Sequence, residues 1–275
     1  DWLGDYPPMR KATMQSLSLP HHQRPRQRGV ALFVVIVFVM LSMLLALWAS
    51  RTSLFNEMLV GNDADYQRAF EAAQALLQDA ELDIRNENPD GSACTATNCR
   101  DKVAEAPKIP LETQDVTPLL ADLDTKTTAK CSHGLCTKRA GRQDFWNKKD
   151  ETGLAAGEFS LASMTKTVGG VTPGARYGQF SGATLGDSDN PANPILADRS
   201  AANRGGWYWI EVMPYDESSK NSGLIVGAGG AATANLLNLN LKPNVVYRIT
   251  ALAYGRKGNT MAVLQQTYAR QFVKD

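Results

Sequence analysis

The strongest hydrophobic pattern in the chain is an apolar run from Val30 to Ala49, in which Ser42 is the only polar residue. These 20 residues would form a helix roughly 30 Å long, which matches the hydrocarbon core of a bilayer. Backbone groups find no water inside lipid, so a helix is the expected conformation. A core helix of a soluble protein is less favoured, because the remaining chain could not easily cover a uniformly apolar rod. We therefore predict a transmembrane helix over residues 30–49.

An amphipathic pattern follows over residues 51–85. Its apolar residues recur mostly at gaps of three, four or seven, which places them on one face of a helix. They are Leu54, Met58, Leu59, Tyr66, Ala69, Phe70, Ala73, Leu77, Ala80 and Ile84. We interpret this stripe as a face that packs on the chain's own domain rather than as a partner groove. The two patterns predict one helix over residues 30–85, on the order of 80 Å long, with Gly61-Asn62 as a candidate soft point and Asn86 at its end.

Residues 86–275 are enough for one compact domain. The part up to residue 206 is rich in Gly, Pro, Asn, Thr and Ser, and we expect loops, short helices and one or two strands there. Further on, runs of aromatic, β-branched or alternating apolar residues predict strands over 206–215, 235–242, 244–255 and 260–273. The last two runs are joined by "RKGN", a hairpin signal. An antiparallel sheet lying across the upper helix would give an α+β fold.

Charge predicts the orientation of the apolar helix. Five basic and two acidic residues precede Gly29, whereas the whole chain is nearly neutral, with 29 basic and 28 acidic residues. Short basic flanks stay in the cytoplasm, so we expect the N-terminus to be cytoplasmic and residues beyond about 51 to lie outside the bacterial inner membrane. The near-neutral balance, without a basic stripe, argues against a nucleic-acid surface.

The flanks of the apolar run indicate how the chain is processed. An ordinary signal peptide has a shorter apolar core followed by a small-residue cleavage site, and such a site is weak here, at Leu47–Trp48. Basic residues followed by Gly29 lie instead at the N-terminal end of the run. Cleavage after Gly29 would remove the charged leader, residues 1–29, and keep the whole apolar helix.

This arrangement resembles the class III leader of type IV pilins and pseudopilins. The resemblance implies that a prepilin peptidase cuts after Gly29 and that Val30 becomes the methylated N-terminus of the mature chain. The sequence opens with Asp1, and Met14 is a candidate start of a compact leader, with residues 1–13 upstream of it.

The segment "RTSLFNEMLVGNDADYQRAFEAAQALLQDAELDI", residues 51–84, narrows the resemblance to minor pilins of the PilX type. The residues that carry it are Glu57, Met58, Gly61, Asn62, Ala69, Phe70, Ala72, Ala73, Ala75, Leu77, Asp79, Ala80 and Glu81. The end of the chain, "YRITALAYGRKGNTMAVLQQTY" (247–268), is similar to the end of the same family. The resemblance implies a pilin-like fold and a structural role. Its implied partners are other minor pilins, the major pilin and a tip adhesin.

One position departs from the pilin pattern. Major pilins carry a glutamate four residues after the new N-terminus, and here that position is Val34. A carboxylate inside a membrane needs a partner, and the resemblance implies that this partner is the N-terminal amine of the subunit above. A subunit with Val34 has no such need, which fits a place at the fibre tip, as in K-type pseudopilins of type II secretion. The simpler interpretation is that valine suits any transmembrane helix.

The four cysteines occur as two pairs with four residues between the members, Cys94 with Cys99 and Cys131 with Cys136. Zinc is one interpretation, but structural zinc sites usually belong to intracellular proteins with other spacings. Outside the inner membrane disulfides are the default. The sequence does not fix the connectivity, and we favour two local bridges and expect no metal.

We find no catalytic constellation and expect neither an enzyme nor a cofactor. His133 is the only histidine outside the leader, and no motif for a catalytic serine, a metalloprotease or a phosphate loop is present. The "DSDN" segment (187–190) resembles the start of a calcium loop but lacks the glycine and the distal glutamate, so a solvated turn is favoured. The run from Trp207 to Trp209 is either a binding platform or a strand with alternating burial.

These observations lead to a hypothesis of a structural minor pilin. It would be held in inner-membrane lipid before assembly, help to initiate type IV pili at or near their tip, and support adhesion and twitching motility. One alternative is a pseudopilin at the tip of a type II secretion pseudopilus. A second, of another class, is an anchored periplasmic enzyme or binding protein.

Overall fold

The structure is a computed structural model that describes residues 28–139, 144–214, 225–226, 232–233, 245–258 and 260–270. It divides into two compact units, Asp1–Asn56 and Glu57–Asp275. The boundary falls inside the first helix, because the helix from Glu57 onward belongs with the folded domain. The strand expected over 235–242 lies outside the described residues.

Helix α1 (Arg28–Arg85) runs through both sequence patterns without interruption at Gly61 and Asn62. In the first unit every described side chain from Val30 onward is exposed. Among the described residues, one helical stretch, beginning at Val30, is long and apolar enough to cross a membrane. In the second unit, one side of α1 becomes buried from Asp65 onward.

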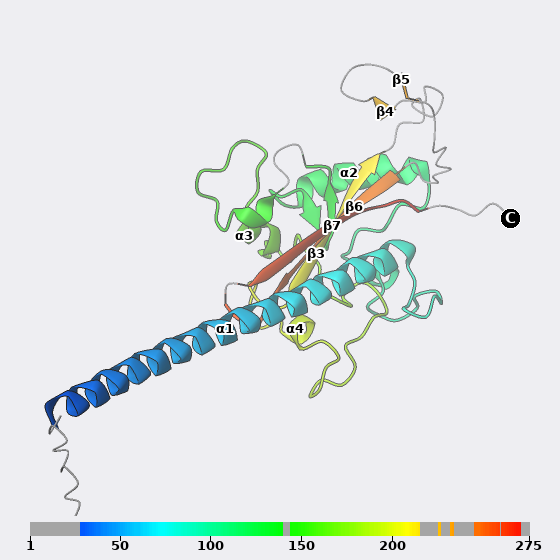
Figure 1. Ribbon diagram of the computed structural model, residues 1–275. Helices are drawn as coiled ribbons and strands as arrows, with labels where there is room; N and C mark the ends of the chain where they lie inside the picture. The colour runs from blue at the N-terminus through cyan, green and yellow to red at the C-terminus, as the bar shows by residue number, and fades with distance from the viewer. Residues whose placement is uncertain are drawn as a thin grey trace, which may run out of the picture. The chain divides into compact units, whose positions relative to one another are not determined.

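The second unit is built on a five-stranded sheet with the strand order β1-β2-β3-β6-β7 (Figure 1). Its strands are β1 (Cys131–Ser132), β2 (Leu135–Thr137), β3 (Gly206–Pro214), β6 (Val245–Tyr254) and β7 (Met261–Tyr268). Only the β2–β3 pair within this sheet is parallel. The short strands β4 (Ile225–Val226) and β5 (Ala232–Thr233) pair with each other. The α+β expectation and the three long strands expected in the described residues are confirmed.

Alternation along the strands gives the sheet two apolar faces. Tyr208 and Ile210 of β3, with Ile249 of β6, face α1 and share a core with Ala72 and Leu76 of that helix. The opposite face of the sheet forms a second core, which includes Trp207, Trp209, Leu252, Phe145 and Met164. Figure 1 shows α1 and the sheet. Helix α3 (Leu161–Thr165) contributes to the second core, whereas the buried residues of α2 (Thr113–Lys126) belong to the core shared with α1.

The region before β3 supplies the short elements that the sequence predicted. They are η1 (Arg100–Lys102), α2 (Thr113–Lys126), η2 (Phe145–Asn147), α3 (Leu161–Thr165) and α4 (Pro194–Ala197). The longest, α2, begins with a capping box in which Glu112 and Asp115 bond each other's backbone N–H groups. Its residues Val116, Leu119 and Leu123 are buried. The helix therefore packs by one apolar stripe, as an amphipathic surface helix does.

Candidate functional site: the buried aspartates of helix α1

The buried stripe of α1 combines small residues with charged ones. Ala69, Ala72 and Ala73 are fully buried, and their small side chains let the helix lie close to the sheet. Three aspartates on the same side, Asp65, Asp79 and Asp83, are 2%, 1% and 0% exposed. A buried carboxylate is costly unless it is paired and hydrogen-bonded, so each aspartate must have partners in the domain.

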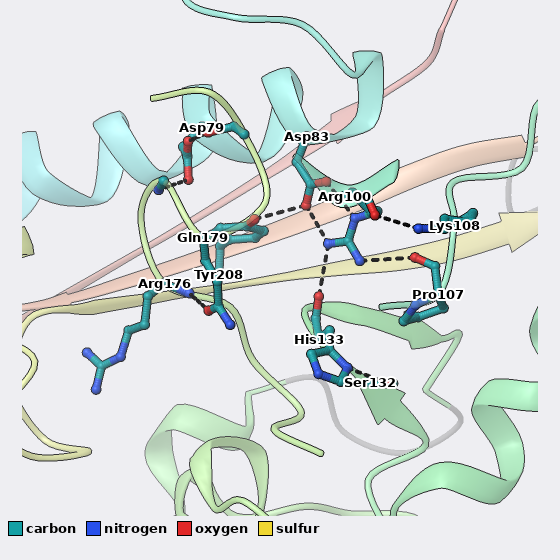
Figure 2. Close-up of polar contacts among 12 residues, drawn as sticks. Asp79, Asp83, Arg100, Pro107, Lys108, Ser132, His133, Arg176, Gln179 and Tyr208 are labelled. Atoms are coloured by element: carbon teal, nitrogen blue, oxygen red, sulfur yellow. Dashed lines mark hydrogen bonds and ion pairs between the residues drawn. The ribbon is translucent and has the colours of Figure 1, made fainter. Parts of the chain in front are cut away.

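Asp83 forms a two-point ion pair with Arg100 of η1 (Figure 2). Arg100 Nε lies 2.6 Å from Asp83 Oδ1 and Nη2 lies 2.5 Å from Oδ2. The Tyr208 hydroxyl donates to Asp83 Oδ2 over 2.9 Å. Burial, together with the carboxylates of Asp83 and Asp79, raises the pKa of Tyr208 well above its ordinary value. Burial acts to lower the pKa of Arg100, but the charge and hydrogen bonds of Asp83, together with Tyr208, outweigh it and raise that pKa.

Arg100 also joins several loops to the helix. Its guanidinium donates to the carbonyl oxygens of Pro107 and His133 over 3.2 and 2.9 Å, and it lies 4.4 Å from the centre of the Phe180 ring. Lys108 Nζ donates to the Arg100 carbonyl oxygen over 2.7 Å. The buried guanidinium of Arg100 therefore links the C-terminal end of α1 to the segment after η1 and to the β1–β2 turn (Figure 2).

Asp79, one helical turn earlier, holds a different loop. It accepts hydrogen bonds from the Ser181 hydroxyl and, over 2.8 Å, from the Gly178 N–H. Asn98 donates to the carbonyl oxygens of the same two loop residues. Burial raises the pKa of Asp79 to about 7, despite the opposing effect of the two hydrogen bonds. This carboxyl group therefore titrates near neutral pH.

Asp65 binds the turn between β6 and β7. Its Oδ1 accepts the Arg256 N–H over 2.9 Å and its Oδ2 accepts the Lys257 N–H over 3.1 Å. The Thr260 side chain adds a third hydrogen bond. Burial acts to raise the pKa of Asp65, but these hydrogen bonds and the Lys257 charge hold it below its ordinary value. Asp65 is therefore a charged anchor at neutral pH.

A further buried charge lies on the other face of the sheet. Glu211 of β3 is fully buried and accepts hydrogen bonds from the guanidinium groups of Arg139 and Arg248. Burial acts to raise the pKa of Glu211, but the two arginines hold it below the ordinary value. The contacts join the end of β2 to β3 and β6, so this cluster is structural.

The predicted processing residues lie in the first turns of α1. The structure places Gly29, Val30 and Val34 in the helix, and the side chains of Val30 and Val34 are 64% and 43% exposed. No described residue packs over them. Their roles in cleavage and assembly remain predictions.

The cysteines form two local disulfides, Cys94–Cys99 and Cys131–Cys136. The second bridge links paired residues of β1 and β2, and His133 lies in the turn between these strands with a left-handed backbone (φ 52°). Burial lowers the pKa of His133. Within the described ranges no group of three or more His, Cys, Asp or Glu side chains is arranged to hold a metal.

The two other candidate motifs have local structural explanations. Trp207 and Trp209 donate their indole N–H groups to the carbonyl oxygens of Ala202 and Met164, and both rings are buried. Asp187 caps the exposed Asp189 N–H in a turn. The Trp pair therefore belongs to the core, and the aspartates belong to a solvated turn.

The sequence alone does not predict the aspartate anchors. Asp79 belongs to the family pattern, whereas no motif points to Asp65 or Asp83. A signal was present, because all three lie on the apolar stripe of the helix rather than on its polar side. A charge on an apolar stripe indicates a buried partner, but the partners lie 17 to 195 residues away.

A long apolar N-terminal helix whose second half packs on a mostly antiparallel sheet defines a pilin-like protein. The family model described as type IV pilus assembly protein PilX, C-terminal part, matches residues 132–270, and that of the PilX N-terminal part matches residues 28–78. The chain belongs to the PilX family of type IV pilus assembly proteins. Comparisons with curated proteins and with solved structures find no match.

Family membership confirms the resemblance on which the sequence analysis relied. It makes the chain a structural component of type IV pilus assembly that works with other pilus components. The apolar start of α1 fits the membrane anchor of a pilin.

Proposed function

We propose that this chain is a minor pilin that helps to initiate type IV pilus assembly and occupies the fibre tip or a position close to it. The observation that carries the proposal is the contrast within α1. Residues 30–60 are exposed on every side, although most of them are apolar, whereas the same helix is buried from Asp65 onward. An exposed apolar rod of this length needs lipid or other apolar helices around it.

The proposed mechanism is an exchange of packing partners. Prepilin peptidase cuts after Gly29, Val30 becomes the methylated N-terminus, and residues 30–49 stay in the inner membrane with the cleaved leader on the cytoplasmic side. On assembly the helix leaves lipid and packs against helices of the major pilin and of other minor pilins. The domain, which we place outside the membrane, then faces solvent, sibling minor pilins and a tip adhesin, and so supports adhesion and twitching motility.

Val34 supports the tip position. A glutamate at this point would need a cationic partner inside an apolar bundle, whereas valine needs none. The subunit can therefore lack a neighbour above it while its own N-terminal amine receives the glutamate of the subunit below. The same residue favours a second candidate, a tip pseudopilin of type II secretion.

Complementation of a gene deletion tests the proposal. We expect the deletion to abolish or strongly reduce surface pili and twitching, and the wild-type gene to restore both. A chain whose residues 30–49 are replaced by an unrelated apolar helix of equal length should reach the membrane but fail to restore pili. Normal piliation with the replaced helix would contradict the packing mechanism. Loss of secreted enzymes with intact pili would favour the pseudopilin.

Processing is tested on the mature chain. N-terminal sequencing should find methylated Val30, and Gly29→Lys should leave the leader attached. An intact Gly29–Val30 bond in cells that contain the peptidase would contradict the proposed cleavage. Val34→Glu should be processed normally yet initiate fewer pili, because the new carboxylate lacks a partner above it.

A further inference from the structure

The base of the domain is joined to α1 through polar contacts rather than through an apolar core. We define the base joint as Gly61, Asn62 and Asp65 of α1 together with the turn residues 255–260 between β6 and β7, as far as these are described. Besides the three hydrogen bonds to Asp65, Lys257 Nζ donates to Asn62 Oδ1 over 3.0 Å. The turn is closed by its own backbone bond from the Gly255 N–H to the Thr260 carbonyl oxygen, 2.9 Å long.

Two glycines make this close approach feasible. A methyl group at Gly255 would overlap both the Asp65 carboxylate and the Thr260 side chain. A methyl group at Gly61 would lie 2.8 Å from Lys257 Nζ, the movable end of a flexible side chain. The helix and the turn therefore fit each other at backbone distance, and Gly255 is the position with the least room for a side chain.

The base joint lies at the point along α1 where the packing of the helix on the domain begins. All residues from Glu57 to Val60 are exposed, and Asp65 is the first buried residue of the helix. The apolar interface begins only one turn later, at Ala69. Among the described residues, the contacts of the base joint supply every hydrogen bond between residues 57–68 and the rest of the domain.

The joint also brings together two distant parts of the chain. Asp65 lies within the N-terminal family match and the turn lies within the C-terminal one, about 190 residues later. Residues 61–65, which include the candidate soft point, and residues 254–258, which include the start of the hairpin signal, contact each other here. Hydrogen bonds of this kind exchange readily with bonds to water, so such a joint can open without disturbing an apolar core.

We propose that the base joint is a latch that fixes the height and tilt of the domain on α1 and that it opens independently of the interface above it. The closed latch holds the base of the domain at Asp65. The open latch releases residues 57–68 and leaves the domain attached only through the stripe from Ala69 onward. The consequence for assembly rests on the proposed function: a fibre whose helices pack in register needs each domain at one fixed height.

Trypsin cleavage of the full chain in detergent micelles tests the latch, because Arg256 and Lys257 are cleavage sites within the turn. We expect Asp65→Ala to speed cleavage at these residues at least tenfold while cleavage at Lys149, an exposed residue of another segment, stays unchanged. Asp63→Ala is the matched control, since Asp63 is an exposed aspartate two residues away with no described partner. Gly255→Ala should reproduce the effect of Asp65→Ala while the carboxylate stays in the chain, because the added methyl group overlaps it.

Two results would overturn the latch. One is cleavage of Asp65→Ala at the wild-type rate. The other is an equal acceleration at all sites together with a large fall in Tm, which would mean that the joint unfolds only with the whole domain.

Surface pilus counts at equal protein levels separate the latch from the proposed function. We expect Asp65→Ala to reduce pili at least tenfold and Asp63→Ala to leave them unchanged. If the turn opens but pili remain normal, the latch does not set the height of the domain, and the minor pilin assignment stands. If deleting the gene leaves pili normal, the proposed function fails whatever the cleavage results are.

Discussion

The two halves of helix α1 use polar side chains in opposite ways. In the apolar half, the hydroxyls of Ser42 and Thr52 donate to the carbonyl oxygens of Phe38 and Trp48, one turn earlier in the same helix. In the half that belongs to the domain, the buried aspartates reach out to loops and strands far away in the sequence. The first half bonds these hydroxyls within the helix itself and presents a mostly apolar surface, which fits the exchange of packing partners that we propose. The second half is bound to one set of partners.

Side-chain size follows the same division. The exposed half carries Leu, Phe, Val and Met, whereas the buried stripe of the other half begins with Asp65, Ala69, Ala72 and Ala73. Small residues allow a close approach to one fixed surface, while large residues fill the space between lipid chains or between helices. The difference fits the proposed mechanism, in which one half of the helix keeps a permanent interface and the other half exchanges its partners.

The largest effect is expected from Arg100→Met. This change leaves the Asp83 carboxylate buried without its cation, and breaking a buried pair in this way costs about 3–5 kcal/mol. Urea unfolding of the full chain in detergent, followed by the fluorescence of the buried tryptophans, measures the loss. Lys126→Met is the control, because its ion pair with Asp122 is exposed and such pairs contribute about 0–1 kcal/mol. An equal, small effect of both changes would mean that the anchors of the domain half are dispensable.

The sequence predicted the helices and strands better than the tertiary contacts that join them. The apolar run, the amphipathic stripe and the strands at 206–214, 245–254 and 261–268 are local patterns with a period that reports burial. The pairing of Asp83 with Arg100, or of Asp65 with the turn at Lys257, depends on the tertiary fold and leaves no periodic signal. The pairing of β2 with β3 was equally hidden, because a three-residue strand is too short to show alternation.

A second comparison uses the same change in both halves. Leu76→Ala removes a fully buried side chain at the centre of the α1–sheet core and should cost about 2–5 kcal/mol in the same unfolding assay. Leu44→Ala should leave the stability of the domain unchanged, because Leu44 is exposed in the first unit. Destabilisation of the domain by Leu44→Ala would show that the two halves are not independent.

The smallest of these effects is a pH dependence confined to the domain half, since residues 30–50 contain no charged side chain. The pKa of Asp79 is about 7 in the fold, against an ordinary 3.8, so between these values the folded chain holds a proton that the unfolded chain has lost. Stability should therefore rise as the pH falls from 8 to 5.5, by roughly 2 kcal/mol.

His133 has the opposite effect on this pH dependence. Burial lowers its pKa, so its contribution makes stability fall as the pH falls. The test is consequently the difference between wild type and Asp79→Asn, in which the histidine contribution cancels. Asp63→Asn should keep the wild-type slope, and an unchanged slope in Asp79→Asn would show that Asp79 stays charged in its buried site.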